Sequence, residues 1–133
     1  MTHSYPVRVY YEDTDLAGIV YYANYLKFIE RGRSEWVRAR GVDQVALKAA
    51  EGIVFAVRKV DADYLKPAKF DDELRVTTEL LSMGGARIDL RQEVWRGEER
   101  LFTAAVTLVC LSDSGQAARI PAEVRAALEP VRH

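Results

Sequence analysis

The stretch YYEDTDLAGIVYYANYLKFIERGRSEW, residues 10–36, decides the fold of this chain. Three carboxylates stand close together at its start, at Glu12, Asp13 and Asp15. The apolar residues that follow recur at a spacing typical of an amphipathic helix, which we expect over residues 21–40. Gly32 falls mid-helix, where it costs stability but lets a strand approach closely. A turn or a cap needs one acid at most, so the other carboxylates need an explanation.

Beyond this helix the apolar pattern changes. A shorter helix is expected over residues 43–51, between a capping aspartate and Gly52, and after Gly52 apolar and polar residues alternate as they do in strands. Strands are predicted at residues 5–11, 53–64, 74–80, 88–94 and 101–111, and a short helix after Pro121. The fold class is therefore α+β. An antiparallel sheet of about five strands is expected to curl around one long central helix, in a single domain over residues 1–133.

Composition narrows the possible functions. The chain has 133 residues, a net charge of −1 and a single cysteine, Cys110. Charges of both signs are interspersed, which argues against a nucleic-acid partner. No apolar run approaches the length of a membrane span, and the amino terminus lacks the apolar core of a signal peptide. With one cysteine and no internal disulfide, a cytoplasmic location is expected.

The two histidines, His3 and His133, both lie at chain ends, where order is least expected. Catalysis by Ser-His-Asp or Cys-His groups needs an imidazole that is held in place. A zinc site also lacks ligands, because one cysteine and two terminal histidines cannot form a tetrahedral set. We therefore expect no metal and no cofactor. Any active site must use carboxylates, hydroxyls, backbone amides or basic groups.

Asp15 is the acid whose surroundings indicate chemistry, whereas Glu12 and Asp13 are expected to be solvated charges at a strand end. An apolar loop, residues 16–20, follows Asp15. The helix then begins near Tyr22, and its first N–H groups lack intrahelical partners. Such donors suit an oxygen that develops negative charge. The alternative is that Asp15 closes a turn or caps the helix, and the residues alone leave both interpretations open.

A resemblance favours the catalytic interpretation. YYEDTDLAGIVYYANYLKFIERGRSE, residues 10–35, resembles the signature of the hotdog-fold acyl-CoA thioesterases in the 4-hydroxybenzoyl-CoA thioesterase family. It is particularly similar to the Tol-Pal-associated, YbgC-like branch. DADYLKPAKFDDEL, residues 61–74, resembles the tyrosine-proline-aspartate turn of that family. The resemblance covers nearly the whole chain, and it implies a single hotdog thioesterase domain.

The resemblance also implies roles for individual residues. Asp15 matches the catalytic carboxylate, and Tyr11 matches the tyrosine ahead of it, which would donate a hydrogen bond or simply pack. Tyr22 stands where the Tol-Pal branch usually carries a histidine and the hydroxybenzoyl branch a tyrosine, whose backbone N–H binds the thioester oxygen. Asp15 would attack the thioester carbonyl directly, or deprotonate a water that attacks it. Both routes are open at this stage.

Further residues are candidates for substrate binding. Gly18 and Val20, in the apolar loop, are expected to contact the substrate and to limit water access. Lys59, Lys66 and Arg87 are candidate contacts for the phosphates of coenzyme A. The resemblance implies that the substrate is an acyl-CoA.

The resemblance implies a homodimer or homotetramer with the active site between protomers. The competing interpretation is a non-catalytic module that binds acyl-CoA or acyl carrier protein, or that acts as a scaffold in envelope assembly. A hotdog dehydratase is disfavoured, because that family relies on a core histidine.

Overall fold

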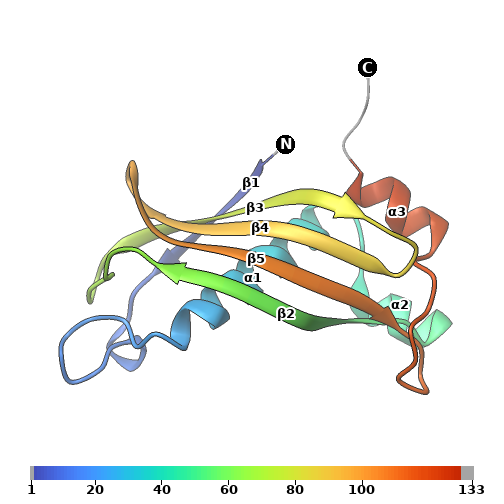
Figure 1. The fold of residues 1–133 in the computed structure, drawn as a ribbon, viewed down its shortest axis with the longest axis horizontal. Coiled ribbons are helices and arrows are strands. Elements are labelled where there is room, and N and C mark those ends of the chain that lie inside the picture. The colour runs from blue at the N-terminus through green and yellow to red at the C-terminus, as the bar shows by residue number, and fades with distance from the viewer. Residues whose placement is uncertain (1, 130–133) are drawn as a thin grey trace.

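The structure is a computed structural model, and it describes residues 2–129 (Figure 1). The elements in chain order are β1 (Thr2–Arg8), the short 3-10 helix η1 (Tyr11–Asp13), α1 (Asn24–Ala39), α2 (Gln44–Glu51), β2 (Val54–Tyr64), β3 (Glu73–Met83), β4 (Arg87–Arg96), β5 (Glu99–Leu111) and α3 (Ala122–Leu128). The strands form one antiparallel sheet in the order β1-β3-β4-β5-β2. This arrangement confirms the α+β class.

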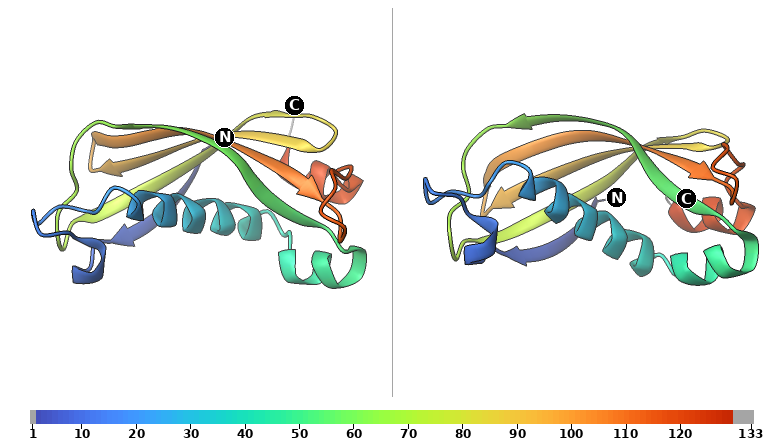
Figure 2. Two further views of the ribbon diagram at one scale, coloured as in Figure 1. Left: turned by 60° about the horizontal axis from the view of Figure 1, so that its bottom comes forward. Right: turned by 90° about the horizontal axis from the view of Figure 1, so that it is seen from below.

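The sheet curls, and α1 runs along its concave face (Figure 2). Register shifts in β2, β3 and β5 mark bulges, which bend strands and increase their twist. Phe28, Ile29 and Trp36 on the inner side of α1 are almost fully buried. The helix packs mainly against β1, β3 and β4, so the concave side of β2 is less covered, and Val57 and Val60 remain exposed there.

Gly32 lies where α1 meets β3, as the sequence predicts. A Cβ at this position would overlap the side chain of Val76. Beside this contact the buried Gln92 of β4 donates hydrogen bonds to the carbonyl of Ile29 at 2.8 Å and to Thr78 Oγ1 at 2.9 Å. A helix carbonyl and two strands are thus joined beside the contact between Gly32 and Val76.

Two expectations about the amino-terminal region are wrong. The first strand ends at Arg8 rather than residue 11, because the chain turns through η1. Asp13 is not a solvated charge: it is 8% exposed, and its Oδ2 accepts the N–H of Tyr10 at 2.8 Å. One of the three acids is therefore a structural residue that closes the turn.

The long helix begins at Asn24, about three residues later than expected. His3 is not a loose end, because it lies in β1 opposite Thr78, while His133 lies outside the described residues. His3 is near the beginning of β1, and Asp15 follows the end of that strand. A strand rises about 3.3 Å per residue, so His3 and Asp15 lie at opposite ends of β1.

Candidate active site

The loop that carries Asp15 is a tight turn. Thr14 and Val20 form an antiparallel bridge, the Asp15 N–H donates to the carbonyl of Ile19 at 2.9 Å, and the Gly18 N–H donates to the carbonyl of Asp15 at 3.0 Å. Gly18 has a φ of +81°, in the left-handed region that favours glycine. A Cβ at Gly18 would meet nothing within 4 Å, so the glycine is needed for the bend rather than for a close approach.

Val20 anchors this loop to the core. Its side chain is buried, and its N–H donates to the carbonyl of Ala68 at 2.8 Å. Of the two loop residues predicted to contact substrate, Gly18 is exposed and Val20 faces the interior of the protomer.

The Asp15 carboxylate is exposed and only partly engaged. Its Oδ1 accepts the N–H of Ala17 at 2.9 Å. One oxygen of the carboxylate therefore closes a turn, as the alternative interpretation of Asp15 expects. No donor within residues 2–129 reaches Oδ2. The pKa of Tyr21 is raised, chiefly by the side chain of Tyr22 and to a smaller degree by burial and by the charge of Asp15. The carboxylate therefore lies within electrostatic range of Tyr21, in the segment that precedes α1.

The backbone before α1 offers free donors. The N–H groups of Asn24, Tyr25 and Leu26 donate to carbonyls three residues earlier, and Ala23 provides no side-chain cap. For the Tyr22 and Ala23 N–H groups, no acceptor is present in the described part of the chain. Uncapped amides at the start of a helix are suited to binding an oxygen that carries negative charge. The amide that the sequence singled out, that of Tyr22, is thus available.

Tyr64 is a site residue that the sequence reasoning missed. Its hydroxyl donates to the carbonyl of Tyr22 at 3.0 Å, and the two rings meet edge to face with centroids 6.1 Å apart. Burial, and then the neighbouring Tyr22, raise the pKa of Tyr64. This contact ties the end of β2 to the peptide that carries the Ala23 N–H, next to the peptide of the Tyr22 N–H. The available signal was the position of Tyr64 in the DADYLKP segment, ahead of a proline.

Tyr11 packs against a neighbouring ring. It stacks on Phe70 with centroids 4.1 Å apart and an angle of 4° between the planes, and it is 78% exposed. Its hydroxyl has no partner in the range 2–129. The geometry of the protomer therefore favours the packing interpretation of Tyr11.

Comparison with known proteins places this geometry in a family. The sequence model of the thioesterase superfamily matches residues 17–103. The chain belongs to this superfamily. The match begins two residues after Asp15, and it includes Gly18, Tyr22 and Tyr64.

Relatives and solved structures agree with this assignment. The chain is 44% identical over 109 residues to the acyl-CoA thioester hydrolase YbgC of Escherichia coli O6:H1, covering 82% of this chain and 81% of that protein. It is 40% identical over 131 residues to the acyl-CoA thioesterase YbgC of Haemophilus influenzae, covering 97% and 96%. A probable thioesterase from Bartonella henselae superposes with a TM-score of 0.88 at 36% identity, covering 91% of this chain and 100% of that one. These matches confirm the hotdog fold that the resemblance implied.

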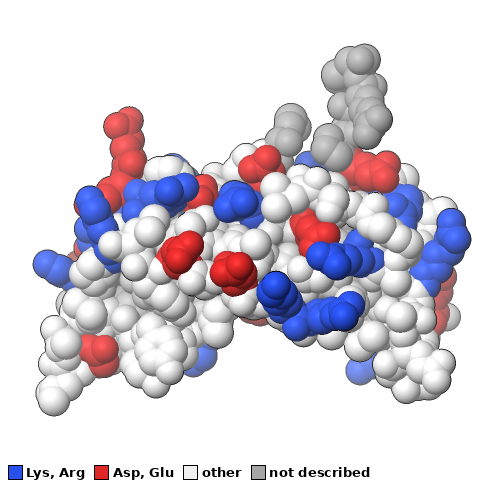
Figure 3. All heavy atoms as spheres, in the orientation of Figure 1, with Lys and Arg blue, Asp and Glu red and all other residues white. Residues whose placement is uncertain are grey.

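The basic residues expected to hold phosphates are dispersed in this superfamily member. Lys66 follows β2 and pairs with Glu99 at 2.9 Å, while Lys59 lies on the exposed side of β2. Figure 3 shows basic side chains gathered over β2. Arg87 begins β4, opposite Val109, and its Nε contacts Asp89 at 3.0 Å. The register places Arg87 and Lys66 at opposite ends of the sheet, so one protomer does not bring the three together.

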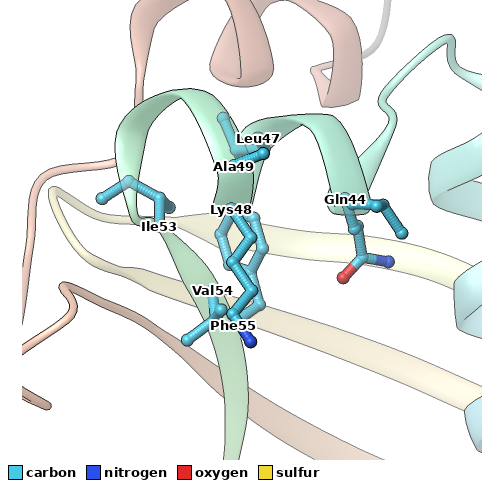
Figure 4. A pocket seen from close by; sticks show the side chains of 8 residues that line it. Gln44, Leu47, Lys48, Ala49, Ile53, Val54 and Phe55 are labelled. Carbon is cyan, nitrogen blue, oxygen red and sulfur yellow. The ribbon is translucent and has the colours of Figure 1, made fainter.

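A hollow of about 700 Å³ lies far from Asp15, between α2 and the beginning of β2 (Figure 4). It is lined by Gln44, Val45, Leu47, Lys48, Ala49, Ile53, Val54 and Phe55. None of these side chains is an acid. Because β2 starts here and ends at Tyr64, about 30 Å away at 3.3 Å per residue, this hollow is not part of the candidate site.

Two further observations bear on the chemistry. Within the described range, no three His, Cys, Asp or Glu side chains group so that they could hold a metal ion. None of the helices in that range is long and apolar enough to cross a membrane.

Proposed function

We propose that this protein hydrolyses acyl-CoA thioesters to a free acid and CoA, with Asp15 as the catalytic carboxylate and the Tyr22 N–H as the donor that polarises the thioester carbonyl. The observation that carries this proposal is the pairing of a half-free carboxylate with uncapped amides in one short segment. Membership of the thioesterase superfamily and the activity named for the YbgC relatives support it.

The reaction suits these groups. A thioester carbonyl has weak resonance and is easily attacked, and a thiolate leaves without a general acid. Asp15 attacks the carbonyl and displaces the CoA thiolate to form an anhydride that water then hydrolyses, or it takes a proton from a water that attacks the carbonyl and displaces the thiolate. In either route negative charge develops on the carbonyl oxygen, where the Tyr22 N–H meets it. We further propose that the exposed Tyr11 and Gly18 contact the substrate.

We also propose that the protein is a homodimer, or a homotetramer built from such dimers. β2 is an edge strand of 11 residues with unpaired backbone groups, and edge strands are normally covered or paired. Antiparallel pairing of β2 with its copy would bring the Arg87 end of one sheet toward the Lys66 end of the other. Lys59 and Lys66 of one protomer and Arg87 of the next would then share the CoA phosphates. The activity belongs in the cytoplasm, where Cys110 stays reduced.

The alternative is a module that binds acyl-CoA or acyl carrier protein, or serves envelope assembly, without turnover. The bond from the Ala17 N–H to Asp15 favours it, because a carboxylate that stabilises its own loop is less available for chemistry.

Thiol release from short-chain, long-chain and aromatic acyl-CoA thioesters separates the two proposals. Asp15→Asn keeps an acceptor for the Ala17 N–H and removes the charge. We expect kcat to fall at least about 100-fold while acyl-CoA binding persists. Glu12→Gln, an exposed neighbour, is the matched control and should keep wild-type turnover. Full activity in Asp15→Asn, or no thiol release by wild-type protein from any thioester, would reject the enzymatic proposal.

A further inference from the structure

The segment of residues 67–72, between β2 and β3, holds the loop that carries Asp15. The Val20 N–H of that loop donates to the carbonyl of Ala68 at 2.8 Å. The Ala68 N–H in turn donates to the hydroxyl of Tyr25, on the first turn of α1, at 3.0 Å. Ala68 is fully buried between these partners. One short segment therefore joins the loop of the carboxylate to the helix whose first amides are free donors.

The 67–72 segment has a backbone that needs support from side chains. Asp71 has a φ of +70°, in the left-handed region that is unfavourable for a residue with a Cβ. Such a backbone persists only where the surrounding contacts hold it. Within the segment, the Lys69 N–H donates to Asp72 Oδ2 at 2.9 Å, and the Asp72 N–H donates to the Lys69 carbonyl at 3.1 Å. The Asp72 carboxylate is therefore central to the shape of the segment.

Arg96, the last residue of β4, binds the segment from the sheet. Its Nη1 donates to Asp72 Oδ2 at 2.8 Å and to the carbonyl of Pro67 at 3.3 Å, so it contacts both ends of the segment. Its Nη2 donates to Glu99 Oε1 at 2.6 Å. The hydrogen bonds to Glu99, and then those to Asp72, raise the pKa of Arg96. Because a guanidinium presents its donors in a rigid plane, one side chain can fix all three groups at once.

We propose that Arg96 is a positioning residue for hydrolysis: by holding the 67–72 segment against β4, it fixes the loop of Asp15 relative to the Tyr22 N–H. The inference rests on the proposed function. Arg96 acts through other residues, since its guanidinium is engaged by Asp72, Pro67 and Glu99. A clamp of this kind can affect the rate, because a misplacement of about 1 Å in a reacting group can slow a reaction about 100-fold.

The alternative is a contact that only stabilises the β4–β5 turn. Arg96 and Glu99 are three positions apart across that turn, and ion pairs near the surface usually contribute little. The two interpretations differ in the contact that matters. Positioning depends on Asp72 and changes the loop of Asp15, whereas closing the turn depends on Glu99 and changes only the general stability of the protein.

Steady-state thiol release tests the contact with Asp72. Arg96→Gln removes the charge, and Asp72→Asn keeps an acceptor for the Lys69 N–H while it weakens the pairing. Each should lower kcat about five- to tenfold and change KM less than about twofold. Because both variants break one contact, the double variant should be no slower than the slower single variant. Arg96→Lys keeps a cation near Asp72 and should recover part of the lost kcat.

Arg100→Gln is the matched control. It breaks an ion pair with Glu93 of 3.0 Å in the same β4–β5 hairpin, and Arg100 forms no ion pair with the 67–72 segment. Its kcat should therefore equal that of the wild type.

Amide hydrogen exchange, followed by NMR, provides a measurement that does not depend on turnover. The Val20 N–H reports the contact with the 67–72 segment, and the Cys110 N–H, which donates to the Ala86 carbonyl at 2.8 Å, reports the buried far end of β5. In Arg96→Gln the Val20 amide should exchange at least about fivefold faster while the Cys110 amide is unchanged, because the opening is local. General destabilisation would speed both.

The outcomes separate this inference from the proposed function. Wild-type kcat in Arg96→Gln, equal acceleration of the Val20 and Cys110 amides, or additive effects of the Arg96→Gln and Asp72→Asn changes would overturn the inference while the hydrolase stands. A wild-type protein that releases no thiol would reject the hydrolase and with it any role of Arg96 in hydrolysis. Should Arg96→Gln fail to fold, Asp72→Asn tests the same contact by both measurements.

Discussion

The hydroxyl of Tyr64 donates a hydrogen bond to the backbone carbonyl of Tyr22 at 3.0 Å, joining residues that are 42 positions apart. The Tyr22 carbonyl belongs to the peptide that precedes Ala23, and the Ala23 and Tyr22 N–H groups are the free donors of the candidate site. Tyr64 therefore fixes the direction of the Ala23 N–H, and through the Tyr22 backbone it restrains the neighbouring Tyr22 N–H, although it need not touch the substrate.

Tyr64→Phe should slow turnover more than it weakens binding. The change keeps the ring contacts with Tyr22 and removes the hydrogen bond, which costs about 1 kcal/mol of stability. Looser orientation of the Tyr22 peptide should lower kcat about three- to tenfold, with KM nearly unchanged. Steady-state kinetics measures both constants, and Tyr10→Phe, an exposed tyrosine, is the control. Equal kcat values for Tyr64→Phe and wild type would show that Tyr64 does not position the groups of the site.

Asp13→Ala should destabilise the fold. Without the carboxylate, the Tyr10 N–H loses its acceptor in a part-buried turn, at a cost of about 1–3 kcal/mol. Asp13→Asn keeps an acceptor oxygen and should lose clearly less stability than Asp13→Ala. The exposed Glu12→Ala should have a free energy of unfolding close to that of the wild type. Urea unfolding followed by circular dichroism gives all three free energies of unfolding. Equal stability of the alanine and asparagine variants would contradict this role of Asp13.

Asp89 should make stability depend on pH in the acid range. Hydrogen bonds from Arg87, Thr107 and Ser82, with that of Arg87 the largest effect, lower the pKa of Asp89 against a smaller opposing effect of burial. A lowered folded-state pKa adds stability above the unfolded value of about 3.9, and this stability disappears as pH falls through the folded value.

Wild-type protein should therefore exceed Asp89→Asn by about 1 kcal/mol at pH 7, and the gap should close toward pH 2. Urea titrations at several pH values measure it. A gap that is constant from pH 7 to pH 2 would argue against the pKa as its origin.

The helices and strands could be predicted because each has a local cause. Alternation identifies the strands, and the three- to four-residue spacing identifies α1. The start of α1 was placed too early because residues 24–26 bond to carbonyls three positions back, and no capping side chain marks that turn. Asp13 was expected in water because acids usually are, and its burial depends on the Tyr10 amide and on packing that periodicity does not encode.

The candidate site divides in the same way. Asp15 and Tyr22 both lie within the motif of residues 10–35, so one short segment contains them and the sequence was enough to single them out. Tyr64 reaches Tyr22 only through the register of β2 with β5, which a local pattern does not specify. Strand order also determines where Lys59, Lys66 and Arg87 lie on the sheet. Their basic character alone therefore could not show whether the three side chains lie together.

Gly32→Ala tests the closest approach between α1 and the sheet. In an exposed helix this change would add about 1 kcal/mol, because alanine is the better helix former. Here the new methyl group overlaps Val76, and overpacking of this kind costs about 1–3 kcal/mol. We therefore expect a net loss of stability and a lower Tm in thermal unfolding.

Val76→Ala should recover part of that loss in the double variant, because it removes the overlapping methyl groups, and the double-mutant cycle measures this coupling. Gly85→Ala, where a Cβ meets nothing within 4 Å, should leave Tm almost unchanged. A Gly32→Ala protein more stable than wild type would mean that helix and strand separate readily, and that Gly32 is not required for their contact.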